Sequence, residues 1–382
     1  MNLNVFYSLE SDPVFLKLIR YNDSNSSDDF NLLMRELLIY RAEENLSFYV
    51  ESLILHSENV FSKSAANGEE ISSFLRLAVE LDLTLIYEAI NKLTSSVRFS
   101  KGKFSLLSGN VSSDYVTLQD FYSRNGYGIF IDNRAFRLDS NDALEPVTHP
   151  SAITLQSLKD YEEEKRIVLQ NVESFVMGLP FSNMLLYGER GTGKSSTVHA
   201  IVNKYFSRKL RIVEINKENV FHLGKLKARL ASVPMKFMIF IDDLSLPSGD
   251  ERISTLKATL EGALEGHADN VMIVATSNRR HIVDEKFSVR NDSVHAGDSM
   301  QEELSLSDRF GISVLFASTT KPQYLSIVRQ LAADEGIKTE TAELELLAER
   351  FAISKGGRSP RRAKQFVSLL SAAEQRGVKL EF

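Results

Sequence analysis

The sequence predicts an α/β protein in which a parallel sheet carries the chemistry, with a mainly helical region before the sheet and a helical lid after it. From about residue 151, short apolar runs alternate with helical patterns, which is typical of parallel β–α–β units. Before about residue 106, apolar residues recur at three- and four-residue spacing, which is typical of helices. After residue 320 the pattern is helical only.

Composition excludes several classes of protein. A chain of 382 residues holds two or three domains at about 100–200 residues each. The absence of cysteine excludes disulfides, thiolate catalysis and sulfur-ligated zinc. The charge, 45 basic against 51 acidic residues, argues against a surface that binds nucleic acid throughout, but not against a local basic groove.

The chain shows neither a signal peptide nor a membrane span. The first residues lack a basic region followed by an apolar one, and no apolar run approaches the roughly 20 residues that cross a bilayer. We therefore expect a cytoplasmic protein with no membrane partner.

We expect four parts: a helical N-terminal domain over residues 1–106, a linker with a short hairpin over 107–154, an α/β core over 155–320 and a helical lid over 321–382. In the first part, apolar stripes predict helices at 30–40 and 72–83, and polar clusters predict loops at 22–29 and 62–68. We assign the stripes to the core of a helical bundle, a partner surface being the alternative. The hairpin is expected over 128–138, with its turn at Asp132-Asn133.

The core and the lid follow from the same patterns. We expect strands at residues 183–187, 211–215, 237–241, 271–276 and 312–316, and lid helices at 325–335, 342–351 and 360–374. The polar stretch from Arg280 to Ser307 has little periodicity and is expected to be a surface loop.

A phosphate-binding loop lies between the first of these strands and a helical segment. The run Gly188-Glu-Arg-Gly-Thr-Gly-Lys-Ser195 matches G-x-x-x-x-G-K-[ST] at every position. Its glycines let backbone N–H groups surround a β-phosphate at a helix N-terminus. Lys194 is placed to contact the β- and γ-phosphates, and the Ser195 hydroxyl to bind Mg²⁺. The predicted nucleotide-binding residues are Gly188, Glu189, Arg190, Gly191, Thr192, Gly193, Lys194, Ser195 and Ser196.

Two carboxylates end the apolar run at 237–241. Strands of a parallel sheet end at the edge where ligands bind, so Asp242 is expected on the Mg²⁺ side. Asp243 is then placed to polarise the attacking water, the alternative being a cap on the following segment. If Asp243 is not the catalytic carboxylate, Glu251 is the next candidate.

Together these residues resemble those of the AAA+ ATPases, over about 155–375. The resemblance implies that Asn278 holds the attacking water, that Arg309 is an arginine finger reaching a neighbouring subunit, and that Arg361 is the sensor-2 arginine of the lid. Arg358 and Arg362 are alternatives for sensor 2, and Arg279 or Arg280 for the subunit interface; His281 is taken as a loop residue. It also implies that adenine packs just upstream of the first strand, near residues 161–166, whose glutamates are expected on a solvated helical face.

The runs at 187–196, 241–245 and 275–281 closely resemble a bacterial AAA+ family catalogued as a domain of unknown function. The expected activity is Mg²⁺-dependent ATP hydrolysis by a homo-oligomer, a ring or a spiral, that remodels or regulates a protein client. The alternative is an initiator- or helicase-loader-like switch acting with DNA, which the double aspartate also resembles. Direct DNA binding is possible through the basic C-terminal stretch but not favoured, because one arginine there is assigned to the nucleotide and Phe366 is its single aromatic residue.

Overall fold

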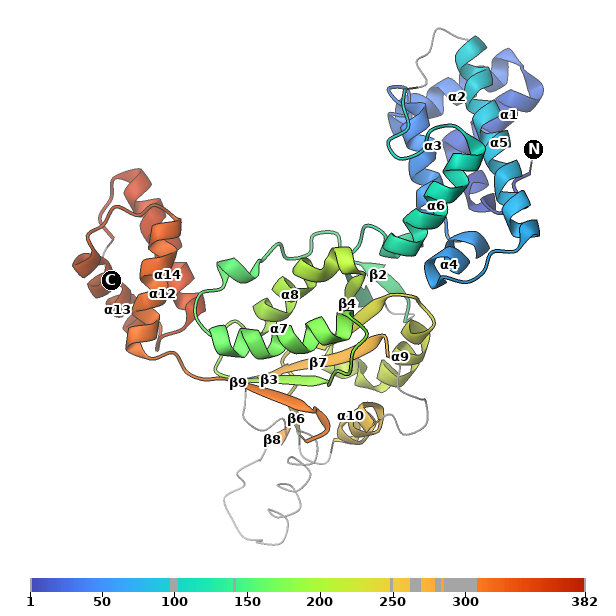
Figure 1. The fold of residues 1–382 in the computed structure, drawn as a ribbon. Helices are drawn as coiled ribbons and strands as arrows, with labels where there is room; N and C mark the ends of the chain where they lie inside the picture. The colour runs from blue at the N-terminus through green and yellow to red at the C-terminus, as the bar shows by residue number, and fades with distance from the viewer. Residues whose placement is uncertain are drawn as a thin grey trace. The chain divides into compact units, whose positions relative to one another are not determined.

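The computed structural model describes residues 2–96, 102–139, 142–247, 250–261, 269–278, 283–284 and 308–380 (Figure 1). Its contacts divide the chain into two compact units, Met1–Asn133 and Arg134–Phe382, which we describe separately. Across the described ranges, no helix is both long and apolar enough to cross a membrane.

The first unit is helical. It contains α1 (Pro13–Ser24), α2 (Ser27–Tyr40), α3 (Leu46–Leu55), α4 (Val60–Asn67), α5 (Ser73–Ser96) and α6 (Val111–Asn125), with 3-10 turns η1 (Tyr7–Ser11) and η2 (Gly128–Phe130). Five of these helices begin at a side chain that accepts a backbone N–H: Asp12, Ser26, Asn45, Asn59 and Asn110. The helices predicted at 30–40 and 72–83 lie in α2 and α5.

Two loop predictions in this unit need correction. Residues 62–67 belong to helix α4, because Asn59 and Ser62 form a capping box that starts a helix there and Gly68, with φ of 71°, ends it. The polar cluster at 22–29 is also mostly helical, since α1 ends at Ser24 and α2 begins at Ser27. In both places the polar residues act as helix caps, which composition alone does not separate from loops.

The second unit is built on a sheet of seven strands in the order β2-β1-β4-β5-β7-β3-β9. These are β1 (Ala135–Leu138), β2 (Leu144–Pro146), β3 (Met184–Gly188), β4 (Leu210–Ile215), β5 (Lys236–Ile241), β7 (Val271–Ser277) and β9 (Ile312–Phe316). All neighbours are parallel except β1 and β2. The five strands predicted for the core are confirmed. Short strands β6 (Leu246–Pro247) and β8 (Val283–Asp284) pair separately.

The predicted hairpin at 128–138 is wrong. Residues 128–130 form the turn η2, and the hairpin joins β1 to β2, with Phe136 opposite Pro146. On its other side β1 pairs in parallel with β4, so it extends the sheet. The stretch expected as a linker, 107–154, therefore divides: α6 lies in the first unit, and β1 and β2 lie in the second.

Helices cover the sheet on both faces. α7 (Glu162–Val176) and α8 (Lys194–Tyr205) pack on one face through a core that includes Phe175, Ile201 and Phe240. The alternate side chains of the strands point to the other face, where α9 (Leu223–Ala231) contacts β7 and α10 (Glu251–Glu261) contacts α9 (Figure 1). Short turns η3 (Leu155–Ser157), η4 (Phe206–Arg208) and η5 (Lys217–His222) connect these elements.

The lid follows β9 and has its own apolar core. It consists of α12 (Lys321–Asp334), α13 (Thr341–Ser354) and α14 (Pro360–Arg376). Thr320 and Ser359 cap α12 and α14, each of which has a proline in its first turn. The three helices predicted for the lid are confirmed.

Candidate nucleotide-binding site

The phosphate-binding loop connects β3 to α8 through backbone conformations that require glycine. Gly188, Gly191 and Gly193 have φ values of 123°, 78° and 102°. A Cβ on Gly188 would lie 2.1 Å from the carbonyl oxygen of Phe316, so no side chain fits there. The loop therefore turns tightly against β9 and delivers the chain to the N-terminus of α8 at Lys194.

Lys194 is buried at the centre of this loop. Its Nζ donates hydrogen bonds to the carbonyl oxygens of Gly188 and Glu189, both at 2.8 Å, and to Oδ1 of Asn278 at 3.2 Å. Burial lowers the pKa of Lys194 to about 8, although the nearby Asp242 and Asp243 carboxylates oppose this shift. An anionic phosphate in the loop would favour the charged ammonium.

Asp242 and Asp243 follow β5 and belong to one hydrogen-bonded network with the ends of β7 and α8. Asp242 Oδ1 accepts from Ser195 Oγ at 2.7 Å and from Thr276 Oγ1 at 2.5 Å. Asp243 Oδ1 accepts from Asn278 Nδ2 at 2.5 Å, and the Asp243 N–H donates to Thr276 Oγ1 at 3.0 Å. Asp243 has a φ of 52°, a left-handed conformation that aspartate tolerates better than most residues.

Thr276 was missed by the sequence analysis. It is the next-to-last residue of β7, so an apolar strand pattern hides it, yet its hydroxyl contacts both acidic residues. One signal in the sequence would have identified Thr276. It is a hydroxyl residue near the end of a central strand, and that strand lies beside the one that ends in two acidic residues.

Ser195 and Asp242 suit a magnesium ion. Mg²⁺ prefers oxygen ligands and is usually held by one or two protein groups together with substrate phosphates and water. The hydroxyl of Ser195 and the carboxylate of Asp242 are adjacent and lie beside the phosphate loop. The structure, over its described residues, contains no cluster of three or more His, Cys, Asp or Glu that could hold a metal alone. The donor set therefore fits a nucleotide-bound Mg²⁺.

A cavity of about 1080 Å³ lies between the core and the lid. At one end, which we call the phosphate end, it is lined by the loop together with Asp242, Asp243 and Asn278. At the other, the base end, it is lined by segment 153–161, including Ile153 and Leu158, and by Ile327 and Leu331 of α12. A cavity with a charged end and an end that carries several apolar side chains suits a nucleotide.

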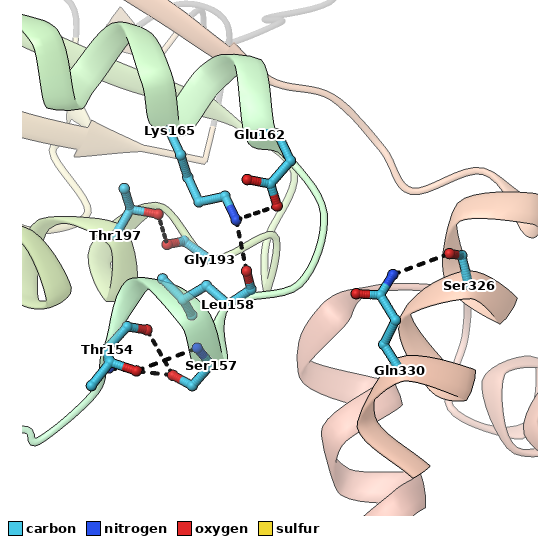
Figure 2. A network of polar contacts seen from close by, with 9 residues as sticks. All are labelled: Thr154, Ser157, Leu158, Glu162, Lys165, Gly193, Thr197, Ser326 and Gln330. Carbon is cyan, nitrogen blue, oxygen red and sulfur yellow. Dashed lines mark hydrogen bonds and ion pairs between the residues drawn. The ribbon is translucent and has the colours of Figure 1, made fainter. Parts of the chain in front are cut away.

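The base end is held together by polar contacts around segment 154–165 (Figure 2). Lys165 is buried, and its Nζ donates to the carbonyl oxygen of Leu158 and to Glu162, both at 2.7 Å. Figure 2 shows this segment on one side of the view and α12, with Ser326 and Gln330, on the other. Tyr161 stacks on Phe316 and donates its hydroxyl proton to the carbonyl oxygen of Ala317 at 2.7 Å. The segment is thus fixed to the end of β9.

The three candidate sensor-2 arginines have different surroundings. Arg361 lines the cavity, and its backbone N–H donates to the carbonyl oxygen of Gly191 at 3.1 Å. Arg358 pairs with Glu349 at 2.8 Å, which raises the pKa of its guanidinium, and Arg362 donates to the carbonyl oxygen of Gly357. Of the three, Arg361 alone reaches the cavity.

The remaining predicted residues are divided between the cavity and the surface. Arg190, Thr192 and Ser196 line the cavity, as do the other loop residues of 190–196. Gly188 and Glu189 are not part of the wall and contribute their backbone carbonyls to Lys194. Arg309 is exposed just before β9 and is not part of the cavity wall. Glu251, at the start of α10, is also exposed and away from the wall. The expectations for Arg279, Arg280, His281 and most of the loop up to Ser307 lie outside the described residues.

The phosphate loop follows the parallel strand β3, the two acidic residues follow β5, and β7 lies between these strands. Together with the helical lid, this arrangement defines a P-loop protein with the AAA+ fold, a class that binds ATP. The chain belongs to the family described as protein of unknown function (DUF815), whose model matches residues 131–374. No curated protein matches it.

Solved structures resemble this fold at low identity. The RuvB Holliday junction branch migration motor of Thermotoga maritima is 16% identical, with a TM-score of 0.40, over 59% of this chain and 67% of that one. The Aeropyrum pernix ORC1 protein, solved in complex with DNA, is 17% identical, with a TM-score of 0.39, over 57% of this chain and 61% of that one. At these values the similarity concerns the fold alone.

Proposed function

We propose that this protein binds Mg²⁺·ATP in the cavity and hydrolyses it to ADP and phosphate. The observation that carries the proposal is the single polar network at the phosphate end. It joins Lys194 of the loop, Asp242 and Asp243 after β5, and Asn278 after β7. Phosphoryl transfer to water uses a cation, a carboxylate beside the metal, an acidic residue and a group that orients the water, all close to the phosphates. Lys194, Asp242, Asp243 and Asn278 are residues of these types.

Each group has a distinct role in this proposal. Backbone N–H groups of the loop and the N-terminus of α8 bind the β-phosphate, and the Lys194 ammonium neutralises the β- and γ-phosphates. Ser195 and Asp242 would hold Mg²⁺, which when bound would withdraw charge from the phosphate oxygens. The Asp243 carboxylate accepts a proton from the attacking water, and Asn278, already hydrogen-bonded to Asp243, orients that water.

Removing the loop cation tests the proposal. Lys194→Ala should abolish measurable ATP binding, because the triphosphate loses its buried cation. The measurement is a calorimetric titration with Mg²⁺·ATP. Lys204→Ala is the matched control, since Lys204 is an exposed lysine of the same helix and is not part of the cavity wall. Unchanged affinity in Lys194→Ala would refute the assignment.

We further propose that the active form is a homo-oligomer in which Arg309 serves the site of a neighbouring subunit. Arg309 is exposed and lies outside the wall of its own cavity, as a residue that acts on another subunit must. A permanently charged, planar guanidinium suits the charge of a transferring phosphate. Head-to-tail contacts of this kind close into rings or continue as spirals.

We propose that hydrolysis is coupled to the remodelling or regulation of a protein client. The support is an exposed apolar stripe on α5 of the first unit: Phe74, Leu77 and Leu81, at 80%, 52% and 49% exposure, lie on one helix face. An Asp243→Asn protein held with ATP should retain its client in pull-down experiments. Adding Phe74→Ser and Leu77→Ser should release the client, whereas Val60→Ser with Val116→Ser, exposed elsewhere in the unit, should not. Retention by both combinations would refute a role for this stripe.

A further inference from the structure

One face of α14 forms part of the lid wall of the nucleotide cavity along two turns of helix. The residues on it recur at three- and four-residue spacing and therefore lie on the same side of the helix. They are Arg361, Lys364, Gln365, Ser368 and Leu369. We call this set the α14 stripe. Along the helix its chemistry changes from cationic through amide and hydroxyl to apolar.

The N-terminal end of the stripe lies at the phosphate end of the cavity. The backbone N–H of Arg361 donates to the carbonyl oxygen of Gly191 at 3.1 Å, and a Cβ added to Gly191 would lie 3.2 Å from the Cβ of Arg361. The first turn of α14 is therefore in direct contact with the phosphate loop.

The C-terminal half of α14 lies toward the base end. Glu374 accepts hydrogen bonds from the backbone N–H groups of Lys338 and Thr339, which follow the end of α12. That end of α12 is in turn joined to the base-end segment, because Asp334 pairs with Lys159 at 2.7 Å. These contacts give the stripe its direction: from the phosphates at Arg361 to the base at Leu369.

The order of side chains along the stripe matches the order of groups in a nucleoside triphosphate. At about 1.5 Å of rise per residue, Gln365 lies about 6 Å along the helix from Arg361, and Leu369 about 12 Å from it. For a nucleotide bound in this direction, the cations would face the triphosphate, Leu369 would face the base, and the amide of Gln365 would face the sugar between them. In the described part of the chain this amide makes no hydrogen bond to protein.

We propose that Gln365 hydrogen-bonds the 2′- and 3′-hydroxyls of the bound ribose, so that the site prefers ribonucleoside over 2′-deoxyribonucleoside triphosphates. A glutamine amide offers an oxygen acceptor and two N–H donors, which suits a pair of neighbouring hydroxyls that donate and accept. This inference rests on the proposed function, because it names the sugar that the same site recognises.

The test is a calorimetric comparison of ATP with 2′-deoxy-ATP in the presence of Mg²⁺. The wild-type protein should bind ATP about three- to tenfold more tightly, the range expected for one neutral hydrogen bond. Gln365→Leu should bind the two nucleotides with equal affinity, because it fills the same space without polar atoms. It loses the bond to the 2′-hydroxyl, which only ATP can make, together with the bond to the 3′-hydroxyl, which both nucleotides share. Gln375→Leu should keep the wild-type preference, since Gln375 is exposed on the same helix and is not part of the cavity wall.

The outcomes separate this inference from the proposed function. Equal affinity of the wild-type protein for the two nucleotides overturns the inference and leaves the ATP site standing. A preference that survives Gln365→Leu but disappears in Ser368→Ala overturns it too, because the neighbouring hydroxyl would then be the group that recognises the sugar. No binding of either nucleotide by the wild-type protein overturns both proposals.

Discussion

The two ends of the nucleotide cavity are built in different ways. The phosphate end is made by one continuous loop and the ends of two adjacent strands, with positive-φ glycines and a closed hydrogen-bond network. The base end is made by side chains of segment 153–161 and of α12 and α14, far apart in the sequence. These parts meet through a partly exposed ion pair, between Lys159 and Asp334.

This difference indicates how function is divided. In the proposed function, the phosphate end holds its charged groups in one hydrogen-bonded network, as electrostatic catalysis requires. The base end depends on how the lid lies against the core, so it suits selection and release of the nucleotide. Substitutions at the phosphate end should therefore change chemistry by orders of magnitude, and those at the base end should change affinity by small factors.

Among substitutions that leave ATP bound, the largest effect on turnover is expected for Arg309→Ala, which tests whether the phosphate end is complete in one subunit. Turnover should fall about 10³-fold or more with ATP affinity unchanged, as for loss of an arginine finger. Arg350→Ala, an exposed arginine of α13, is the control. Mixing Arg309→Ala with Lys194→Ala should partly restore activity, because the second variant still supplies the finger. A monomer at every concentration, with constant specific activity, would rule out this arrangement.

Asp243→Asn tests the acid at the phosphate end. Hydrolysis should slow about 10²- to 10⁴-fold, the usual contribution of a general base, while ATP stays bound. Phosphate release and calorimetry measure the two quantities separately. Glu251→Gln is the control, since Glu251 lies away from the cavity wall. If Asp243→Asn kept the wild-type turnover and Glu251→Gln lost it, Glu251 and not Asp243 would be the catalytic carboxylate.

Ser195→Ala tests the metal at the same end. It removes the hydroxyl beside Asp242, so the Mg²⁺ concentration that supports half-maximal hydrolysis should rise at least about 10-fold, as when a group supporting a metal site is lost. ATP binding in EDTA should stay the same. Ser196→Ala provides the comparison from the next position. An unchanged Mg²⁺ requirement in Ser195→Ala would contradict the proposed ligand.

The smallest effect is expected at the base end, for Lys159→Met. This substitution breaks a partly exposed ion pair, and such pairs stabilise by about 0.2–1 kcal/mol. The dissociation rate of ATP, followed by stopped flow, should rise by no more than about fivefold. Lys159→Glu with Asp334→Lys should restore the rate, and Arg329→Met, which breaks a pair within the lid, should not change it. A rise in the ATP dissociation rate by as large a factor as the fall in hydrolysis expected for Asp243→Asn would show that the two ends are not separable.

The same contrast explains what the sequence predicted. The loop at 188–195, Asp242 and the five core strands were predictable because each is a contiguous pattern whose meaning is local. The strand that pairs with β1 was not predictable, because it is β4, which lies far along the chain. Thr276 was hidden inside a strand pattern, and Gln365 was one polar residue on a basic helix. Their positions depend on which segments the fold brings to one cavity.

The most direct test of the account is phosphate release from Mg²⁺·ATP by the wild-type protein, measured over a range of protein concentrations beside Lys194→Ala. Release should rise more steeply than the protein concentration, because assembly by mass action completes each site, and Lys194→Ala should give only background. Wild-type release no greater than that of Lys194→Ala at every concentration would contradict the claim that the phosphate end hydrolyses ATP.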